Sequence, residues 1–533
     1  MESGLKNALE EKAVKEKLTT SVNPATGEVI GYTKEDAAED VINAVKLARI
    51  AQVSWGKKTF EERAEYIFRI RDYIVKNSDM IAEVISRDNG KTRMDALSTE
   101  VFPITMAITY YAKNAKKLLK RKYLKAGNIL TLNKRSYIDH VPMGVVGIIS
   151  PWNYPFAIPF HEIVMALITG NAVILKVATQ TLEVGKVIKQ CIDAGKLPEN
   201  LFSFFNIPGY LAGDAFIDSG IDKLFFTGSV PVGKKLMAKA AERLMPVSLE
   251  LGGNDAMIVC KDADISRAVS GAIWAGYSNA GQSCAAVERI YVEKEIYENF
   301  ISKLKEGLKA LRVGIDNDFN VDMGSMTTEN QLKTVKLHIK DALEKGATAF
   351  VANPTDEVQR GLFHPAVILE GVNDTMLVMQ QETFGPVVGV EKVESIDEAI
   401  QKANNSTLGL TASVWTNDRK KAHMIASRLE AGAVMINDHL MSHGLAETPW
   451  GGFKESGLGR THSYIGLEEM TQPRVVVDDI MPGVKKNMWW HPHDKNVYDG
   501  LKGAINFLYS KDLSEKVSGL IKLSKVFMRT FRN

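Results

Sequence analysis

One cysteine of the chain, Cys284, lies in a run of small residues, "NAGQSCAAV", just before a predicted strand. The two other cysteines, Cys191 and Cys260, are distant from it in the sequence. A thiol in this setting could be an inert core residue, a metal ligand or a nucleophile. The chain has no CxxC pair and no cysteine–histidine spacing typical of zinc sites, so no metal site is predicted.

Two further stretches contain side chains of the kind that act in catalysis. In "SLELGGNDAMIV", Glu250 interrupts an apolar strand pattern. Apolar surroundings disfavour a charged carboxylate, which can leave it a proton acceptor near neutral pH. In "IISPWNYPF", prolines flank Asn153, and a rigid side-chain amide suits the stabilisation of an oxyanion. The ordinary alternatives are a solvent-exposed glutamate at a strand end and an asparagine in a turn.

Two stretches have features of a phosphate site. "FFTGSVPVGKKL" runs from a strand through Gly228 and Ser229 into a helix, so free backbone amides and the helix dipole could face a phosphate. "AVILKVAT" places Lys176 at the end of a buried strand, where a cation would suit a phosphate or ribose. A plain turn and a solvated lysine remain the alternatives.

The elements that must position these residues alternate between helices and strands. The pattern is helical from about residue 36 to 125 and then predicts a hairpin leading into a buried strand. Short apolar strands follow, in "AVILKV", "LFSFFNI", "KLFFTGS" and "VSLELGG", and again after Cys284 in "RIYV", "ATAFV", "HPAVILEGV", "GPVVGVEKV", "LTASVWT" and "GAVMIN". This alternation predicts an α/β fold with two lobes, each built on a largely parallel sheet.

Composition excludes several classes of protein. A chain of 533 residues is too long for one core, and its 45% hydrophobic and 24% charged residues are typical of globular proteins. A net charge of +2 gives no argument for binding nucleic acid. Few cysteines, no apolar signal segment and no run of about 20 apolar residues lead us to expect a cytoplasmic protein.

The last part of the chain differs from the rest. Residues 483–533 contain ten Lys or Arg and four Asp or Glu, a net charge of +6, which leaves −4 for the remainder of a chain of net charge +2. A helix here would separate apolar from basic residues, with Leu513, Val517, Leu520, Phe527, Met528 and Phe531 on one side and Lys522, Lys525, Arg529 and Arg532 on the other. Such a helix could lie peripherally on anionic lipid, with "MWWHP" at headgroup level, or could pack on the protein's own surface or across a dimer.

Taken together, these motifs resemble a known family. "PWNYP", "LKVA", "FTGS", "ELGGND", "GQSC", "QETFGPV" and "PWGGFKESGLGR" occur in the order and approximate spacing of the NAD(P)-dependent aldehyde dehydrogenase superfamily, over about residues 20 to 480. The resemblance implies a Rossmann-type cofactor domain (1–121 and 141–250), an α/β catalytic domain (251–448) and a small bridging or oligomerisation sheet (122–140 and 449–480), with 481–533 as an extension. Because an exposed sheet edge demands pairing, a homodimer or a dimer of dimers is expected.

The resemblance also implies roles for individual residues. Cys284 would attack the aldehyde to give a thiohemiacetal and then, after hydride transfer, a thioester. Asn153 would stabilise the oxyanion with the backbone N–H of Cys284, and Glu250 would activate the hydrolysing water. Relatives that transfer the acyl group to coenzyme A generally lack this glutamate, so a free acid is the expected product. The implied cofactor-binding residues are Ser150, Trp152, Lys176, Thr179, Gly209, Gly228, Ser229, Val232, Leu251, Gly252, Glu382 and Phe384.

The sequence departs from the family pattern near the cofactor. Thr179 stands where strongly NAD-preferring relatives often carry a glutamate, and without that carboxylate a 2′-phosphate is not repelled. Tyr210 and Leu211 follow Gly209, where many relatives have smaller residues. The choice between NAD and NADP therefore stays open at this point.

The substrate is expected to be an apolar aldehyde, aliphatic or isoprenoid. The segment "DHLMSHGLAETPWGG" should line the entrance, and it is rich in Leu, Met and His without a clear arginine clamp. A semialdehyde such as succinate semialdehyde is the alternative, with Arg289 and Arg460 as the candidate carboxylate partners. Other hypotheses are a non-catalytic structural protein on the same fold and a thiol esterase that uses Cys284 without a cofactor.

Overall fold

The computed structural model describes residues 17–352, 361–481 and 483–531. These residues form two compact units. The larger unit comprises the described parts of Met1–Lys120 and His140–Gln472, and the smaller unit those of Arg121–Asp139 and Pro473–Asn533.

A six-stranded sheet organises the first lobe of the larger unit, in the order β19-β9-β8-β5-β6-β7. Strands β5 to β9 pair in parallel, and β19 runs antiparallel to β9. Since β6 and β8 lie on either side of β5, the strand order reverses there, and ligands of such sheets bind outside the carboxyl ends of the strands at this point. The strands are β5 (Val145–Ile149), β6 (Ala172–Lys176), β7 (Phe202–Phe204), β8 (Lys223–Thr227), β9 (Val247–Glu250) and β19 (Gly457–Leu458).

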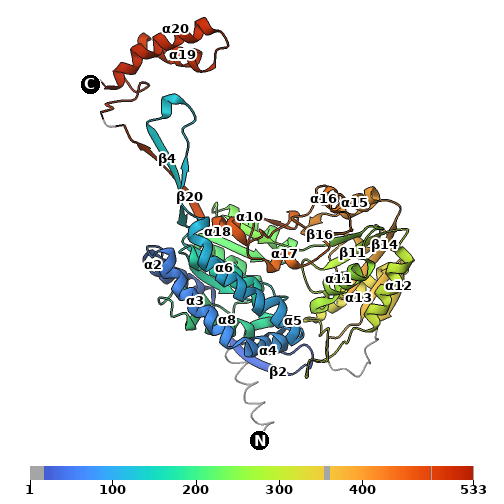
Figure 1. Ribbon diagram of the computed structural model, residues 1–533. Helices are drawn as coiled ribbons and strands as arrows, with labels where there is room; N and C mark the ends of the chain where they lie inside the picture. The colour runs from blue at the N-terminus through green and yellow to red at the C-terminus, as the bar shows by residue number, and fades with distance from the viewer. Residues whose placement is uncertain (1–16, 353–360, 482, 532–533) are drawn as a thin grey trace. The chain divides into compact units, whose positions relative to one another are not determined.

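Helices cover both faces of this sheet (Figure 1). One face carries α2 (Ala38–Trp55), α9 (Gly209–Asp218) and α10 (Val230–Ala241), and the other α3 (Phe60–Lys76), α7 (Ala157–Ile168) and α8 (Leu182–Ala194). Outside the second layer lie α4 (Ser78–Asn89), α5 (Arg93–Ala96) and α6 (Phe102–Leu118), and β1 (Leu18–Val22) pairs with β2 (Val29–Lys34). Helix α7 is buried along its whole length, so every side chain that it carries faces protein.

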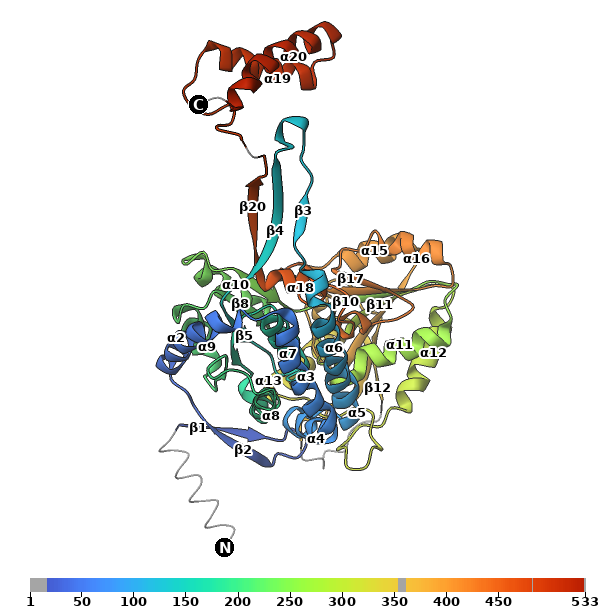
Figure 2. The same ribbon diagram turned by 60° about the vertical axis from the view of Figure 1, so that its left-hand side comes forward.

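The second lobe is built on a seven-stranded sheet in the order β12-β13-β14-β11-β10-β16-β17. All neighbours are parallel except β12, which runs antiparallel to β13. Figures 1 and 2 show α11 (Ile265–Tyr277) and α12 (Tyr297–Lys309) on one side of it and α15 (Ile396–Asn404) and α16 (Arg419–Ala426) on the other. The strands are β10 (Asp255–Val259), β11 (Val287–Glu293), β12 (Thr348–Ala352), β13 (Ala366–Glu370), β14 (Val387–Val393), β16 (Thr411–Trp415) and β17 (Ala433–Ile436). The predicted two-lobed α/β fold is therefore confirmed.

The smaller unit has its own sheet and its own core. The sheet has the order β20-β4-β3, from β3 (Lys122–Leu124), β4 (Lys134–Pro142) and β20 (Thr471–Asp479), which are the hairpin and the strand expected to pair. Helices α19 (Lys495–Tyr509) and α20 (Leu513–Phe527) pack on each other around Ala504, Leu523 and Val526. Their backbones approach closely, because a Cβ atom at Gly519 would lie 2.5 Å from the carbonyl oxygen of Gly503.

Residues 449–472, expected in the bridging segment, lie in the larger unit, and the other expected domain boundaries stay predictions. Within the described ranges, no helix has both the length and the apolar content needed to cross a bilayer.

Candidate active site

Cys284 lies in a tight loop between a 3-10 turn at Ser278–Gly281 and β11. Gly281 has φ +70°, and a Cβ atom there would lie 2.1 Å from the carbonyl oxygen of Gly385, so the loop packs directly on the segment that follows Glu382. Cys284 is partly exposed and lines three cavities, whereas Cys191 and Cys260 are buried. Of the three thiols, Cys284 is thus the one that a ligand can reach.

The largest of these cavities brings the predicted catalytic residues together. Its volume is about 230 Å³, and Cys284, Asn153 and Glu250 all line it. Seven of the predicted cofactor residues also line it: Trp152, Gly228, Ser229, Leu251, Gly252, Glu382 and Phe384. Thr227, Gln331 and Thr334 complete its wall together with Pro151. Segments more than two hundred residues apart in the sequence meet here.

Glu250 ends β9, at the carboxyl edge of the first sheet, and is 5% exposed. Neither of its carboxyl oxygens has a hydrogen-bond partner among the described residues. Burial, and next the neighbouring Glu162, raise the pKa of Glu250 well above its ordinary value. The carboxyl group is therefore free of fixed contacts and disposed to take up a proton.

The thiol of Cys284 is held in its neutral form. Burial raises the pKa of Cys284 well above its ordinary value, and the nearby carboxyl groups of Glu382, Asp255 and Glu250 raise it further. Because the thiolate is the nucleophile, attack on a carbonyl carbon requires a base that removes the proton. Glu250 lines the same cavity as Cys284 and is the candidate for this task.

Asn153 is 3% exposed and is fixed through its backbone. Its carbonyl oxygen accepts hydrogen bonds from Lys91 Nζ at 2.8 Å and from Asn279 Nδ2 at 3.0 Å. Lys91 is paired with Glu100, whose second carboxyl oxygen accepts from the backbone N–H groups of Phe156 and Ala157 at 2.8 and 3.0 Å. This network fixes the backbone from which the Asn153 side chain extends.

Five predicted cofactor residues lie outside the cavity wall: Ser150, Lys176, Thr179, Gly209 and Val232. Ser150 and Lys176 are at the carboxyl ends of β5 and β6, and a Cβ atom on Gly209 would lie 4.0 Å from Lys176 Nζ. Lys176 is 6% exposed, and burial lowers the pKa of its amine to about 8. No anionic partner of this amine is found in the described part of the chain, which fits a group that receives an external phosphate or ribose. Thr179 is half-buried and Val232 is exposed.

Further groups that suit a dinucleotide lie at the start of α10 and around Glu382. Ser229 is the N-cap residue of α10, where backbone N–H groups are free to face a phosphate. Glu382 Oε1 accepts from the Gly253 N–H at 3.0 Å, and burial raises the pKa of Glu382 to about 8. The rings of Trp152 and Phe384 meet edge to face with centroids 5.5 Å apart. These features fit a nicotinamide dinucleotide along the carboxyl ends of the strands.

A second cavity, of about 190 Å³, reaches Cys284 from another direction. Its wall is mostly apolar and aromatic, and none of the described residues that line it is Lys, Arg, Asp or Glu. The apolar residues are Phe102, Pro103, Met106, Tyr154, Ile158, Trp274, Ala285, Leu440, Met441 and Trp450. The predicted entrance segment contributes Leu440, Met441, His443, Gly444 and Trp450.

The two arginines considered as carboxylate partners do not serve this cavity. Arg289 is 2% exposed and donates to the carbonyl oxygens of Asn254, Lys402 and Ala403, so its guanidinium group is used within the protein. Arg460 donates to the carbonyl oxygen of Gly459 and lines neither this cavity nor the larger one. Arg289 therefore has the structural role that was its alternative, and a carboxylate-binding role for Arg460 stays a prediction.

Several residues of the site were not found from the sequence. Glu288 accepts from the backbone N–H groups of Thr383 and Phe384, which fixes the segment that follows Glu382. Lys91 and Glu100 hold the Asn153 segment, and His161, Glu162, His443 and His462 line a third, smaller cavity at Glu250. Glu162 and His161 could have been found from the sequence, because a carboxyl group and an imidazole stand there within an otherwise apolar helix.

Comparison with known proteins agrees with this geometry. The model of the aldehyde dehydrogenase family matches residues 11–476. A Mycolicibacterium smegmatis protein named as a putative NADP-dependent succinate-semialdehyde dehydrogenase is 38% identical over 452 residues, 85% of this chain and 87% of its own. The 4,4′-diapolycopene aldehyde oxidase of Methylomonas sp is 35% identical over 492 residues, 92% of this chain and 91% of its own.

Solved structures that resemble this chain are also aldehyde dehydrogenases. An aldehyde dehydrogenase from Brucella melitensis biovar abortus 2308 has a TM-score of 0.81 at 33% identity, covering 86% of this chain and 93% of its own. Betaine aldehyde dehydrogenase from Staphylococcus aureus, solved in complex with NAD+, has a TM-score of 0.83 at 30% identity, covering 89% and 94%. The chain therefore belongs to the aldehyde dehydrogenase family and is an NAD(P)-dependent oxidoreductase that acts on aldehydes.

Proposed function

We propose that this enzyme oxidises an apolar aldehyde to the free carboxylic acid, with Cys284 as nucleophile, Asn153 as oxyanion donor and Glu250 as general base. One observation carries the proposal: Cys284 lines both the cavity with the cofactor-type residues and the apolar cavity. The sulfur of Cys284 can therefore be reached from the apolar cavity, where an aldehyde would bind, and from the cavity with the predicted cofactor-binding residues.

In the proposed reaction, Glu250 first takes the proton of the Cys284 thiol, and the thiolate forms a bond to the aldehyde carbon. The resulting alkoxide accepts hydrogen bonds from the Asn153 amide and from the backbone N–H of Cys284; removing one such donor commonly costs about 10²–10³ in rate. A bound NAD or NADP supplies the hydride acceptor that turns the adduct into a thioester. Glu250 passes the thiol proton to solvent and then takes a proton from water, whose oxygen bonds to the thioester carbon. The C–S bond breaks, its electron pair returns to Cys284 Sγ, and the acid leaves.

For the cofactor, the proposal assigns residues 1–121 and 141–250 to the binding domain and 251–448 to the catalytic domain. Lys176 and Ser229 would hold phosphate or ribose groups, and Glu382 would accept from ribose hydroxyls. The remaining part of the proposed cofactor site would be lined by Ser150, Trp152, Thr179, Gly209, Gly228, Val232, Leu251, Gly252 and Phe384.

The apolar class of substrate is supported by the wall of the 190 Å³ cavity, which offers no cation to a second carboxylate. The two relatives differ in the aldehydes that their names give, succinate semialdehyde in one case and 4,4′-diapolycopene aldehyde in the other. The cavity chemistry favours the isoprenoid or aliphatic class for this chain.

A chain-length series tests this class of substrate. With linear aldehydes from two to about sixteen carbons, kcat/KM should rise by roughly fourfold for each buried CH₂, which corresponds to about 0.8 kcal/mol. Succinate semialdehyde should be a poor substrate, and a Met106→Arg variant should improve its kcat/KM relative to an aliphatic aldehyde of equal length. A parent enzyme that prefers succinate semialdehyde would contradict the assignment. Retention of activity in a Cys284→Ala variant would contradict the mechanism as well.

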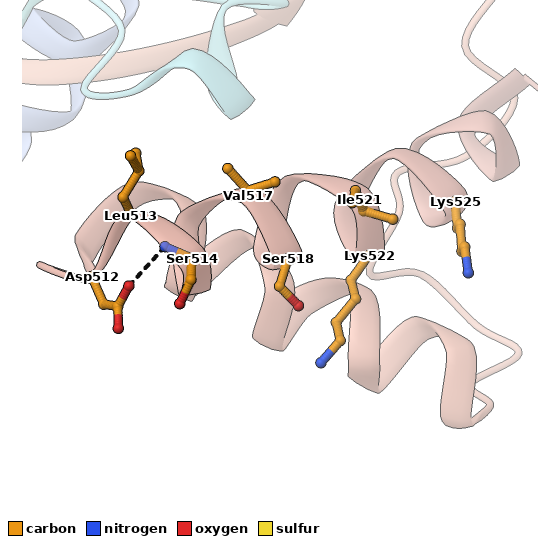
Figure 3. A pocket seen from close by; sticks show the side chains of 8 residues that line it. All are labelled: Asp512, Leu513, Ser514, Val517, Ser518, Ile521, Lys522 and Lys525. Carbon is orange, nitrogen blue, oxygen red and sulfur yellow. Dashed lines mark hydrogen bonds between the residues drawn. The ribbon is translucent and has the colours of Figure 1, made fainter.

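For the C-terminal helices we propose contact with an anionic membrane surface. Helix α20 leaves Leu513, Val517 and Ile521 exposed by 75%, 53% and 54%. Figure 3 shows these side chains along one side of the helix with Lys522 and Lys525 next to them, around an open hollow. The other exposed large apolar residues between 489 and 531 are Trp489, Trp490, Tyr498, Ile505, Tyr509, Leu520, Phe527, Met528 and Phe531. Gly503 and Gly519 let α19 and α20 approach closely, and Ala504, Leu523 and Val526 fill the contact between them.

Flotation of the full chain with anionic and neutral liposomes tests the membrane proposal. The chain should float with anionic vesicles, and a Lys522→Glu/Lys525→Glu variant should lose much of this binding, since each basic residue near such a surface contributes about 1 kcal/mol. A Lys333→Glu/Lys336→Glu variant is the matched control, because these exposed lysines lie on α13 (Glu329–Glu344) of the larger unit. Equal recovery of parent and tail variant in the liposome-free fraction would contradict lipid contact.

Self-association through the sheet of the smaller unit is the remaining proposal. Strand β20 is an edge of that sheet, and its Val475 and Val477 are exposed by 57% and 61%. An apolar edge strand favours pairing with a second copy. A Val475→Lys/Val477→Lys variant should shift the mass measured by light scattering from an oligomer to a monomer; a parent that is monomeric would contradict the proposal.

A further inference from the structure

A third cavity adjoins Glu250 on the side of α7 and α18 (Ser463–Glu469). Its volume is about 20 Å³, which is room for one water molecule. Glu250 and Cys284 both contribute to its wall, so the cavity touches both the general base and the nucleophile of the proposed reaction. The other lining residues are Ile158, His161, Glu162, Thr227, Leu251, His443, Trp450, Thr461 and His462.

The wall of this cavity carries an unusual number of buried polar atoms without partners. His161, Glu162 and His462 are 1%, 2% and 2% exposed. Both ring nitrogens of His161, Nε2 of His462 and Oε2 of Glu162 have no hydrogen-bond partner among the described residues, as is also true of Thr227 Oγ1 and both oxygens of Glu250. Buried polar groups are normally hydrogen-bonded, and an ordered water in a small polar cavity makes two to four such bonds. The composition of this wall therefore matches a water site.

The rings of the three histidines contact one another in tilted and edge-to-face arrangements. The ring centroids of His161 and His462 are 3.9 Å apart, and His443 lies 4.9 Å from His462. Thr461 Oγ1 is 2.8 Å from His462 Nδ1, which fixes that ring. Burial lowers the pKa of all three imidazoles, that of His443 to about 4, so each ring is neutral and offers one N–H donor and one acceptor nitrogen.

The charged groups that face this cluster shift the pKa of Glu250 in both directions. Glu162 on α7 raises the pKa of Glu250, and Glu469 on α18 does so more weakly, while Arg460 lowers it. Burial raises the pKa of Glu162 itself well above its ordinary value. Two carboxyl groups this close do not ionise together, so Glu162 and Glu250 carry at most one negative charge between them.

We propose that His161 and His462 are positioning residues that hold the hydrolytic water in this cavity between Glu250 and the Cys284 thioester. The inference rests on the proposed function. The Glu250 carboxylate takes one proton from that water, and the oxygen forms a bond to the thioester carbon. The tetrahedral adduct collapses, the C–S bond breaks, and its electron pair returns to Cys284 Sγ. The carboxylic acid leaves, and the proton on Glu250 passes to the thiolate, which restores both groups.

The test separates acyl-enzyme formation from its hydrolysis. For His161→Leu and His462→Leu, stopped-flow absorbance at 340 nm with hexanal should show a burst of nearly one reduced cofactor per active site. Slow turnover should follow, because a misplaced water can cost about 10² in rate. KM for the aldehyde should fall with kcat, and intact mass should show the acyl adduct on Cys284. His161→Gln and His462→Gln, which keep a donor and an acceptor, should recover most of the hydrolysis rate.

Controls separate this inference from the proposed function. His364→Leu alters a buried histidine of the second lobe, 8% exposed, and should show no burst beyond that of the parent. Glu250→Gln removes the base of both steps, so it should slow the burst as well as the later turnover, and a parent-like burst and turnover would overturn the proposed function itself. Slowed burst and turnover in Glu250→Gln without acyl-enzyme accumulation in the histidine-to-leucine variants would overturn the water site alone. If His161→Leu does not fold, the same burst experiment is done with His161→Phe, which keeps an aromatic ring but has no ring nitrogens.

Discussion

The ion pair between Lys91 and Glu100 offers a test of how the oxyanion donor is held. Both side chains are 0% exposed, with Lys91 Nζ 2.7 Å from Glu100 Oε1. Lys91 also donates to the carbonyl of Asn153 and lies over the ring of Tyr154, 4.1 Å from its centroid. Glu100 anchors the backbone N–H groups of the next segment, including that of Phe156. Removing one partner leaves a buried charge without compensation.

We expect Lys91→Met to destabilise the protein by about 3–5 kcal/mol, the usual cost of breaking a buried pair by removing one partner. Acylation should slow by up to about 10²-fold, because the Asn153 segment loses an anchor. In the double variant Lys91→Met/Glu100→Gln no charge is left unpaired, so its cost should fall below the sum of the two single costs. Unfolding in urea, followed by tryptophan fluorescence, and the burst rate of cofactor reduction measure the two effects.

The exposed pair of Lys116 and Glu61 is the matched control. Its charges are 2.6 Å apart, but the side chains are 70% and 59% exposed. Solvent screens such a pair, so Lys116→Met should leave the unfolding midpoint and the burst rate nearly unchanged. Equal midpoints for Lys91→Met and Lys116→Met, or strictly additive effects in the double variant, would refute the reasoning.

Three further predictions follow from the site. Alkylation of Cys284 by iodoacetamide, measured by mass spectrometry, should rise roughly tenfold per pH unit from pH 7 to 9, because its pKa is raised and the thiolate fraction grows with pH below the pKa; a plateau below pH 8 would contradict this. Thr179→Glu should raise KM for NADP by roughly tenfold or more with little change for NAD, since a carboxylate repels the 2′-phosphate; equal changes for both cofactors would count against the placement. Gly281→Ala should lower Tm and activity more than Gly346→Ala, because both glycines have positive φ but only Gly281 has a backbone carbonyl 2.1 Å from the added Cβ; similar losses in both would contradict the packing argument.

Patterns that are local in the sequence determined much of the fold and the candidate site. Alternation of apolar runs with helical periods indicated two parallel sheets, because each strand and helix leaves its own period in the chain. Short motifs marked Cys284, Glu250 and Asn153, and ten of the fifteen predicted site residues line one cavity, since strands of a parallel sheet end at the same edge.

Only the tertiary structure decided which distant segments make contact and how burial shifts the pKa of the groups that they bring together. Lys91 reaches a carbonyl 62 residues away, and the acceptors of Arg289 lie up to 114 residues from it, so no local pattern could show that one anchors the site while the other is used in the core. His161 and Glu162 have the sequence context of a buried helix, and His462 that of a loop. Their meeting beside Glu250 depends on how α7 packs against the last residues of the lobe. The charge that each group carries depends on the water excluded there, which is a property of the packed structure.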